Sequence, residues 1–202
     1  MKPYPYTKSV VGRWTSASLL LVLSLSSCFC IKLYFDKGDT FWTDPYKKNM
    51  ILIFKSNKGN ADTIKITNKL IRIADGNCNP LEVSNFSKSY IEVDYESSHT
   101  GWTHDDYLIQ ITKDAMGVKP IPYIRLFNLE FSDNRDSSIV KAQLYLNSLH
   151  KNLKNCFKFQ PTNYTNLGPK QNKISTFYWD HDLGLVKYEN KEGEYWELIS
   201  KR

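Results

Sequence analysis

Two short polar stretches concentrate the side chains that could hold a metal ion or transfer a proton. They read HTGWTHDD and WDHD, and they contain His99, His104, Asp105, Asp106, Asp180, His181 and Asp182. A zinc site or a hydrolytic site needs such groups within a few ångströms of one another. Both stretches fall where turns are predicted, and polar turns collect Asp for conformational reasons. We therefore predict solvated loops, with no catalytic residue, no metal and no cofactor; an enzyme is the alternative.

The N-terminal leader has the layout of a secretory signal. Its three basic residues, Lys2, Lys8 and Arg13, come first, and it contains no acidic residue. The apolar run Leu19–Leu25 and then small residues follow them. A permanent membrane span needs about 20 mostly apolar residues, and this run is shorter. A basic flank, a short apolar stretch and small residues are typical of a removable signal, which we predict over residues 1–27.

The end of this leader, Leu25-Ser26-Ser27-Cys28, resembles the lipobox of bacterial lipoproteins. The resemblance covers these four residues and the layout before them. It implies that the Cys28 thiol receives a diacylglyceryl group and that cleavage falls between Ser27 and Cys28. Each buried methylene contributes about 0.8 kcal/mol, so two or more acyl chains anchor a protein stably where one chain does not. The alternatives are an ordinary cleaved signal, which would release a soluble protein, and an uncleaved anchor in which the cysteine is incidental.

The chain after the leader is long enough for one well-buried domain. Roughly 175 residues suffice for one core and are short for two. We predict that residues 28–48 form the lipidated N-terminus and a tether, and that residues 49–202 form a single β-rich domain. The apolar start of the tether segment also fits a first strand of that domain.

Alternating apolar and polar residues predict a mainly β fold of antiparallel strands. The stretch NMILIFKSNKGNADTIKITN contains an apolar run at Met50–Phe54, a turn at Gly59 and a strand in which Ile64 and Ile66 share a face. This pattern predicts a hairpin. Alternation of the same kind, with a period of two residues, recurs in YIEVDYE, YLIQITK and PYIRLFNLEFS.

One helix is predicted within Ser137–Asn155, which makes the expected fold β-rich α+β. Asp136, Ser137 and Ser138 could cap its N-terminus. The apolar residues behind this cap recur at close to 3.6-residue spacing: Val140, Leu144, Tyr145, Leu149 and Leu153. A strand is the alternative for this segment.

Cysteines beyond Cys28 are candidates for a disulfide, because an exported chain meets an oxidising compartment. Cys78 lies in the loop DGNCNP and Cys156 follows the predicted helix, so we favour this pair and leave Cys30 unpaired. Closing so long a loop would contribute about 4 kcal/mol on the chain-entropy model. The alternative is that both thiols stay unpaired in the core.

The C-terminal segment predicts a three-stranded meander. Ile174–Trp179, Leu185–Tyr188 and Tyr195–Ile199 are short β-rich runs separated by DHDLG and ENKEGE. These separators supply the Gly, Asp and Asn that tight reversals need. The ending resembles the closing segment of lipoproteins from Bacteroidota whose activity is not characterised.

The residues after Cys28 bear on which side of a membrane the chain faces. Surface-exported lipoproteins of that phylum carry acidic residues there, whereas this chain has Phe29, Cys30, Ile31 and Lys32. The departure implies a lipid-anchored protein of the cell envelope that faces the periplasm.

The charge of the chain does not favour a nucleic-acid partner. The formal net charge is +6, but the leader holds three of the 27 basic residues and no acidic ones, leaving 24 basic against 21 acidic residues. The Lys and Arg residues are scattered rather than gathered on one face. We expect no nucleic-acid binding.

These observations together predict a lipid-anchored envelope protein that acts by binding or assembly. The expected partners are the membrane, through the N-terminal lipid, and an envelope protein or an apolar ligand. The alternative function is a carrier that encloses an apolar ligand in a curved sheet, because aromatic residues fit a packed core and a lined cavity equally well. In a carrier, Tyr123–Phe131 and Ile174–Trp179 would line the cavity. A metal-dependent enzyme is the third possibility.

Overall fold

The computed structural model describes residues 32–73, 88–98, 107–114, 117–127, 129–132, 137–161 and 174–202. All the strands described below belong to one compact unit, Leu33–Ala74 together with Lys88–Arg202. In these residues every regular element is a strand, so the predicted mainly β fold is confirmed. The described part of the chain contains no helix that could cross a membrane.

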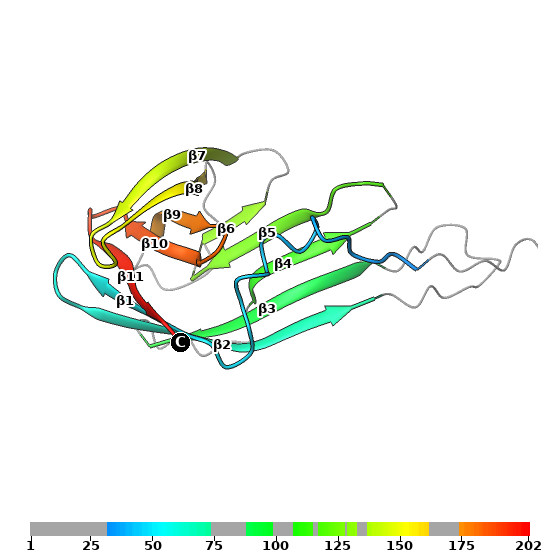
Figure 1. Cartoon of the computed structure of the whole chain (residues 1–202), viewed down its shortest axis with the longest axis horizontal. Coiled ribbons are helices and arrows are strands. Elements are labelled where there is room, and N and C mark those ends of the chain that lie inside the picture. The colour runs from blue at the N-terminus through cyan, green and yellow to red at the C-terminus, as the bar shows by residue number, and fades with distance from the viewer. Residues whose placement is uncertain are drawn as a thin grey trace, which may run out of the picture. The chain divides into compact units, whose positions relative to one another are not determined.

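Eleven strands of the described residues form one antiparallel sheet (Figure 1). They are β1 (Ile51–Ser56), β2 (Ala61–Arg72), β3 (Ser89–Ser97), β4 (Tyr107–Lys113), β5 (Ile121–Leu126), β6 (Leu129–Ser132), β7 (Ser137–Leu146), β8 (Lys151–Pro161), β9 (Ile174–Asp180), β10 (Gly184–Asn190) and β11 (Tyr195–Lys201). Their order is β6-β5-β4-β3-β2-β1-β11-β10-β9-β8-β7, and all neighbours run antiparallel. Two meanders are therefore joined where the first strand pairs with the last.

The sheet is curled, and the side chains on its concave face form the core. Phe131 on β6 contacts Phe159 on β8 with ring centroids 4.8 Å apart, although the two strands are distant in the sheet order. Phe159 in turn stacks on Phe177 of β9 at 4.6 Å. The largest side chains of this core, Trp179 and Trp196 among them, are fully buried. Burial of apolar area at about 25 cal/mol per Å² is the main force that holds such a sheet in its curl.

Period-two patterning places the strands as predicted. On β3, Ile91, Val93 and Tyr95 are buried while the residues between them are partly exposed. The hairpin predicted from Met50–Phe54 is present as β1 and β2, in which Leu52 lies opposite Ile64. The C-terminal meander is confirmed as well, because β10 pairs with both β9 and β11.

The helix predicted within Ser137–Asn155 is wrong, because this segment forms the hairpin β7–β8. The pairing runs from Ala142–Cys156 to Leu144–Leu153, so the extra residue of the bulge lies on β8, while β7 keeps its alternation. The helix-like spacing arises because apolar residues stand on both faces of β7. Val140 and Tyr145 do not share the buried side; they are 51% and 53% exposed. The strand alternative for this segment holds.

Residues 33–48, which we call the strap, pack against the sheet ahead of β1. The sequence assigned this segment to the tether that begins at Cys28. In the structure, Leu33, Thr43 and Tyr46 of the strap are buried. Figure 1 shows the strap as the blue and light-blue trace that leads into β1. Its residues supply one wall of the site described next.

Candidate functional site

Two lysines of the sheet fix the strap in place. Lys113, at the end of β4, is 4% exposed and pairs with Asp39 at 2.7 Å and Asp36 at 3.1 Å. The hydrogen bond to Asp39 raises the pKa of Lys113 above its ordinary value. Lys69 on β2 donates to the backbone carbonyls of Thr43 at 2.9 Å and Tyr46 at 3.3 Å. Burial lowers the pKa of Lys69, and the nearby Asp44 charge partly opposes that effect.

The aromatic side chains of the strap enter the concave face of the sheet. Trp42 packs at 5.2 Å from Phe157 and 5.6 Å from Phe159, both on β8. Tyr46 packs at 5.3 Å from Trp179 on β9. Tyr46 belongs to the buried core and Trp42, which is partly buried, packs against it, so the strap occupies part of the concave face of the sheet.

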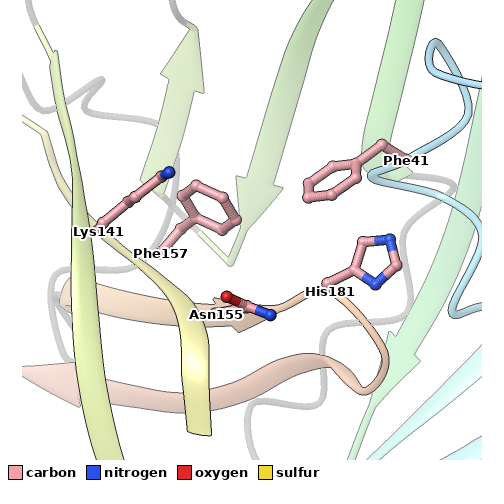
Figure 2. Close-up of a pocket in the computed structure, with 5 residues that line it drawn as sticks. All are labelled: Phe41, Lys141, Asn155, Phe157 and His181. Carbon is pink, nitrogen blue, oxygen red and sulfur yellow. The ribbon is translucent and has the colours of Figure 1, made fainter.

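A pocket of about 320 Å³ opens where the strap meets β7, β8 and the β9–β10 turn. Its lining residues are Phe41, Lys141, Asn155, Phe157 and His181. Figure 2 shows their side chains converging on one space from separate segments of the chain. Small-molecule sites are concave, mostly apolar and carry a few placed polar groups, at about 300–1,000 Å³. The pocket has this character and lies at the small end of that range.

The apolar wall of the pocket is a cluster of aromatic rings that pack against one another. Phe41 lies 5.9 Å from Phe157 at an interplanar angle of 83°, and 4.6 Å from the ring of His181. Trp42 contacts Phe41 at 5.0 Å from the buried side. Edge-to-face pairs of this kind are worth about 0.5–1.5 kcal/mol beyond the area that they bury. The ring positions are therefore set by the strap and β8 together.

The WDHD stretch forms the β9–β10 turn and contributes one pocket residue. The buried Asp180 carboxylate accepts hydrogen bonds from the backbone N–H groups of Asp182 at 3.0 Å and Leu183 at 3.1 Å, so it closes the turn. His181 Nδ1 lies 2.7 Å from Asp182 Oδ1, and its ring faces the pocket. The loop predicted here is present, and among the described residues His181 is the one sequence-derived candidate that lines the pocket.

Most of the other predicted site residues lie outside the described residues. They are His99, His104, Asp105, Asp106, Cys28, Cys30 and Cys78. Within the described ranges, no group of three or more His, Cys, Asp or Glu side chains is placed to hold a metal ion.

Cys156 is described as a free, buried thiol on β8. Burial, with a smaller contribution from the Asp180 charge, raises its pKa to about 12. A thiol of this kind is a poor nucleophile, because the thiolate is the reactive form. The pairing with Cys78 stays a prediction, since Cys78 lies outside the described residues.

A second polar cluster is buried inside the sheet. The Asp62 carboxylate on β2 is fully buried and accepts hydrogen bonds from Tyr188 Oη at 2.5 Å, Ser97 Oγ at 2.9 Å and Ser98 Oγ at 3.3 Å. Burial, followed by the Asp62 charge, raises the pKa of the Tyr188 phenol well above its ordinary value. The cluster connects β2, β3 and β10, with Ser98 at its exposed margin, and we assign it a structural role.

Sequence reasoning missed four of the five pocket residues. The sequence places Phe41 in a tether and Lys141 and Asn155 in a helix, and it assigns Phe157 to no element, so no shared site could be foreseen. The signal that could have found them is period-two patterning of β8, which puts Asn155, Phe157 and Phe159 on one face. Comparison with known proteins gives no match, because no protein-family model, no curated protein and no solved structure is similar to this chain.

Proposed function

We propose that this chain is a lipid-anchored protein of the cell envelope that acts by binding, and that its binding site is the pocket between the strap and the β7–β8 hairpin. Cys28 would carry the lipid and attach the protein to a membrane facing the periplasm. The strap begins a few residues after Cys28, so the pocket would lie close to the attachment point along the chain.

The observation that carries this proposal is the convergence of Phe41, Phe157 and His181 on one pocket. The three come from different segments, and the ring of Phe41 contacts the rings of both Phe157 and His181 beside the pocket. Aromatic side chains at the centre of a pocket are the groups that contribute most to recognition of partners. A pocket with these walls supports binding.

The interior of the curled sheet is filled by side chains. This supports binding at the pocket beside the strap rather than enclosure of an apolar ligand inside the sheet. A carrier would need the inner faces of Tyr123–Phe131 and Ile174–Trp179 to line a cavity. The rings of Phe131, Phe159 and Phe177 pack against one another there, and Trp42 of the strap packs beside them.

The test is recovery of an envelope partner that depends on the pocket. The full chain and its Phe157→Ala variant are cross-linked in envelopes and recovered, and co-purified molecules are identified by native mass spectrometry. Tyr145→Ala is the matched control, because Tyr145 is an exposed aromatic residue of β7 outside the pocket. We expect the parent and Tyr145→Ala to recover the same partner and Phe157→Ala to lose it. Equal recovery by all three would contradict binding at this pocket.

A further inference from the structure

Three polar side chains of the pocket have hydrogen-bonding groups that nothing in the described residues uses. Lys141 and Asn155 form no side-chain hydrogen bond or ion pair within the described part of the chain. His181 uses Nδ1 to bind Asp182, which leaves its Nε2 unused among the same residues. All three side chains line the pocket (Figure 2). A ligand can therefore bind to them without displacing an internal contact.

The hydrogen-bonding roles of these groups differ. The ammonium group of Lys141 only donates, whereas the amide of Asn155 both donates and accepts. A carboxylate only accepts, so His181 Nδ1 donates to Asp182, and Nε2 is left to accept in a neutral ring or to donate in a charged one. The pocket thus presents hydrogen-bond donors and acceptors together, which favours a ligand whose groups can both donate and accept hydrogen bonds.

The ring walls add a second requirement. The rings of Phe41 and Phe157 are nearly perpendicular, and each has an electron-rich face and an electron-poor edge. Such surfaces favour a ligand that has an apolar C–H face as well as polar groups at its margin. The volume of about 320 Å³ limits the bound part to a single ring-sized group rather than an extended chain.

These requirements exclude two simpler ligand classes. An acyl chain would leave the groups of Lys141, Asn155 and His181 without partners, which costs about 1–3 kcal/mol for each group that becomes buried. A carboxylate or phosphate suits Lys141 but has no apolar face to place on Phe41 and Phe157, and it would lie near the Asp182 carboxylate. Hydroxyl groups both donate and accept, and a sugar ring carries several of them around an apolar face.

We infer that the pocket binds a sugar ring, with its C–H face on Phe41 and Phe157 and its hydroxyl groups on Lys141, Asn155 and His181. This inference rests on the proposed binding function and names its ligand class. The ring belongs to a free glycan chain or to the headgroup of a glycolipid, because the chemistry that the pocket recognises is the same in both.

The experiment measures binding of defined saccharides to the full chain in a detergent without a sugar headgroup. The probes are glucose, galactose, N-acetylglucosamine and short linear oligomers of each. Isothermal titration calorimetry measures the affinity and the stoichiometry of binding. Vesicles that contain a glycolipid with the same terminal sugar form the second arm. Asn155→Ala and Lys141→Ala are the test variants, since both side chains are exposed and their removal spares the core. Tyr145→Ala is the control.

We expect one saccharide class to bind at one per chain, with affinity about tenfold lower in each test variant and unchanged in the control, because each loses about one hydrogen bond. Binding of free oligomers identifies a glycan chain, and binding to vesicles alone identifies a glycolipid; both support the inference. Equal affinity in all variants would place the sugar elsewhere and overturn it. If no saccharide binds but a pocket-dependent partner is still recovered, the ligand class is wrong and the proposed function stands. If that recovery also fails, both are wrong.

Discussion

The phenol oxygen of Tyr46 accepts a hydrogen bond of 2.7 Å from the backbone N–H of Leu185. This contact ties the strap to the start of β10, 139 residues later in the sequence. The neighbouring Gly184 has a φ of +82°, which lets the β9–β10 turn approach the Tyr46 ring closely. The pocket depends on this junction, because it holds the strap, which carries Phe41, against the turn that carries His181.

Gly184→Ala should destabilise the protein more than Gly193→Ala. Both glycines have a positive φ, +82° and +80°, so alanine is strained at either site. A Cβ at position 184 would also overlap the Tyr46 hydroxyl, whereas a Cβ at 193 meets no atom. We expect an additional loss of about 1–3 kcal/mol in the free energy of unfolding for Gly184→Ala, typical of overpacking. Urea denaturation measures it, and equal losses would contradict the close approach of strap and turn.

The stability of the protein should fall above about pH 10, in part because of Tyr46. Burial raises the pKa of this phenol well above its ordinary value, against the opposing hydrogen bond from Leu185. The folded state therefore keeps a proton that the unfolded chain loses near pH 10, so the stabilisation is complete below that pH and declines above it.

Tyr46→Phe should show both sides of this linkage in urea denaturation at pH 8 to 11. At pH 8 the variant should be less stable by about 1–3 kcal/mol, because the Leu185 N–H loses its acceptor. Above pH 10 its stability should decline less steeply than that of the parent. Tyr145→Phe alters an exposed phenol and should keep the parent slope; a Tyr46→Phe slope equal to the parent's would argue that this phenol is not buried.

Lys113→Met should loosen the strap, whereas Lys88→Met should not. Lys113 is nearly inaccessible and its ammonium pairs with Asp39 and Asp36, while the Lys88–Asp114 pair is exposed on both sides. Loss of hydrogen bonds between charged groups should cost about 1–3 kcal/mol at Lys113, against less than about 1 kcal/mol for the surface pair. Hydrogen exchange should show faster exchange of strap amides only in Lys113→Met. Unchanged strap protection in that variant would mean that Lys113 does not hold the strap.

Much of the fold could be predicted because buried strands alternate with a period of two. The β1–β2 hairpin and the β9–β11 meander follow directly from their apolar spacing and their turn residues. The β7–β8 hairpin could not be foreseen, because Val140 and Tyr145 are exposed apolar residues on β7 and because a bulge between Leu153 and Cys156 shifts the alternation of β8. Local pattern also carries no information on the pairing of β1 with β11, which joins the two ends of the domain.

The site was less predictable than the fold, since it depends on contacts between distant segments. His181 was recognised as a chemically capable residue, but nothing near it in the sequence indicates that Phe41 would pack at 4.6 Å from its ring. Asp180 was considered for chemistry and instead closes a turn. The sequence shows which side chains are able to do chemistry, but only the folded sheet and strap bring such side chains together in one site.

Cys156 should react with a thiol reagent only after unfolding. Its side chain is fully buried on β8, and burial raises its pKa to about 12, so the folded protein presents almost no thiolate at neutral pH. Alkylation followed by peptide mass mapping should find it unmodified in the native chain and modified in denaturant without added reductant. A need for reductant would instead show that Cys156 is in a disulfide, and non-reducing peptide mapping would then test the Cys78–Cys156 pair that the sequence favours.

Attachment through Cys28 is the claim on which location, partner and ligand source all depend, and intact-mass analysis of the protein isolated from envelopes tests it most directly. The account predicts a mature chain that begins at Cys28 and carries the mass of its acyl chains, and a Cys28→Ala variant that stays unprocessed or lacks those chains. A mature chain that begins at any other residue and has no acyl mass would contradict it.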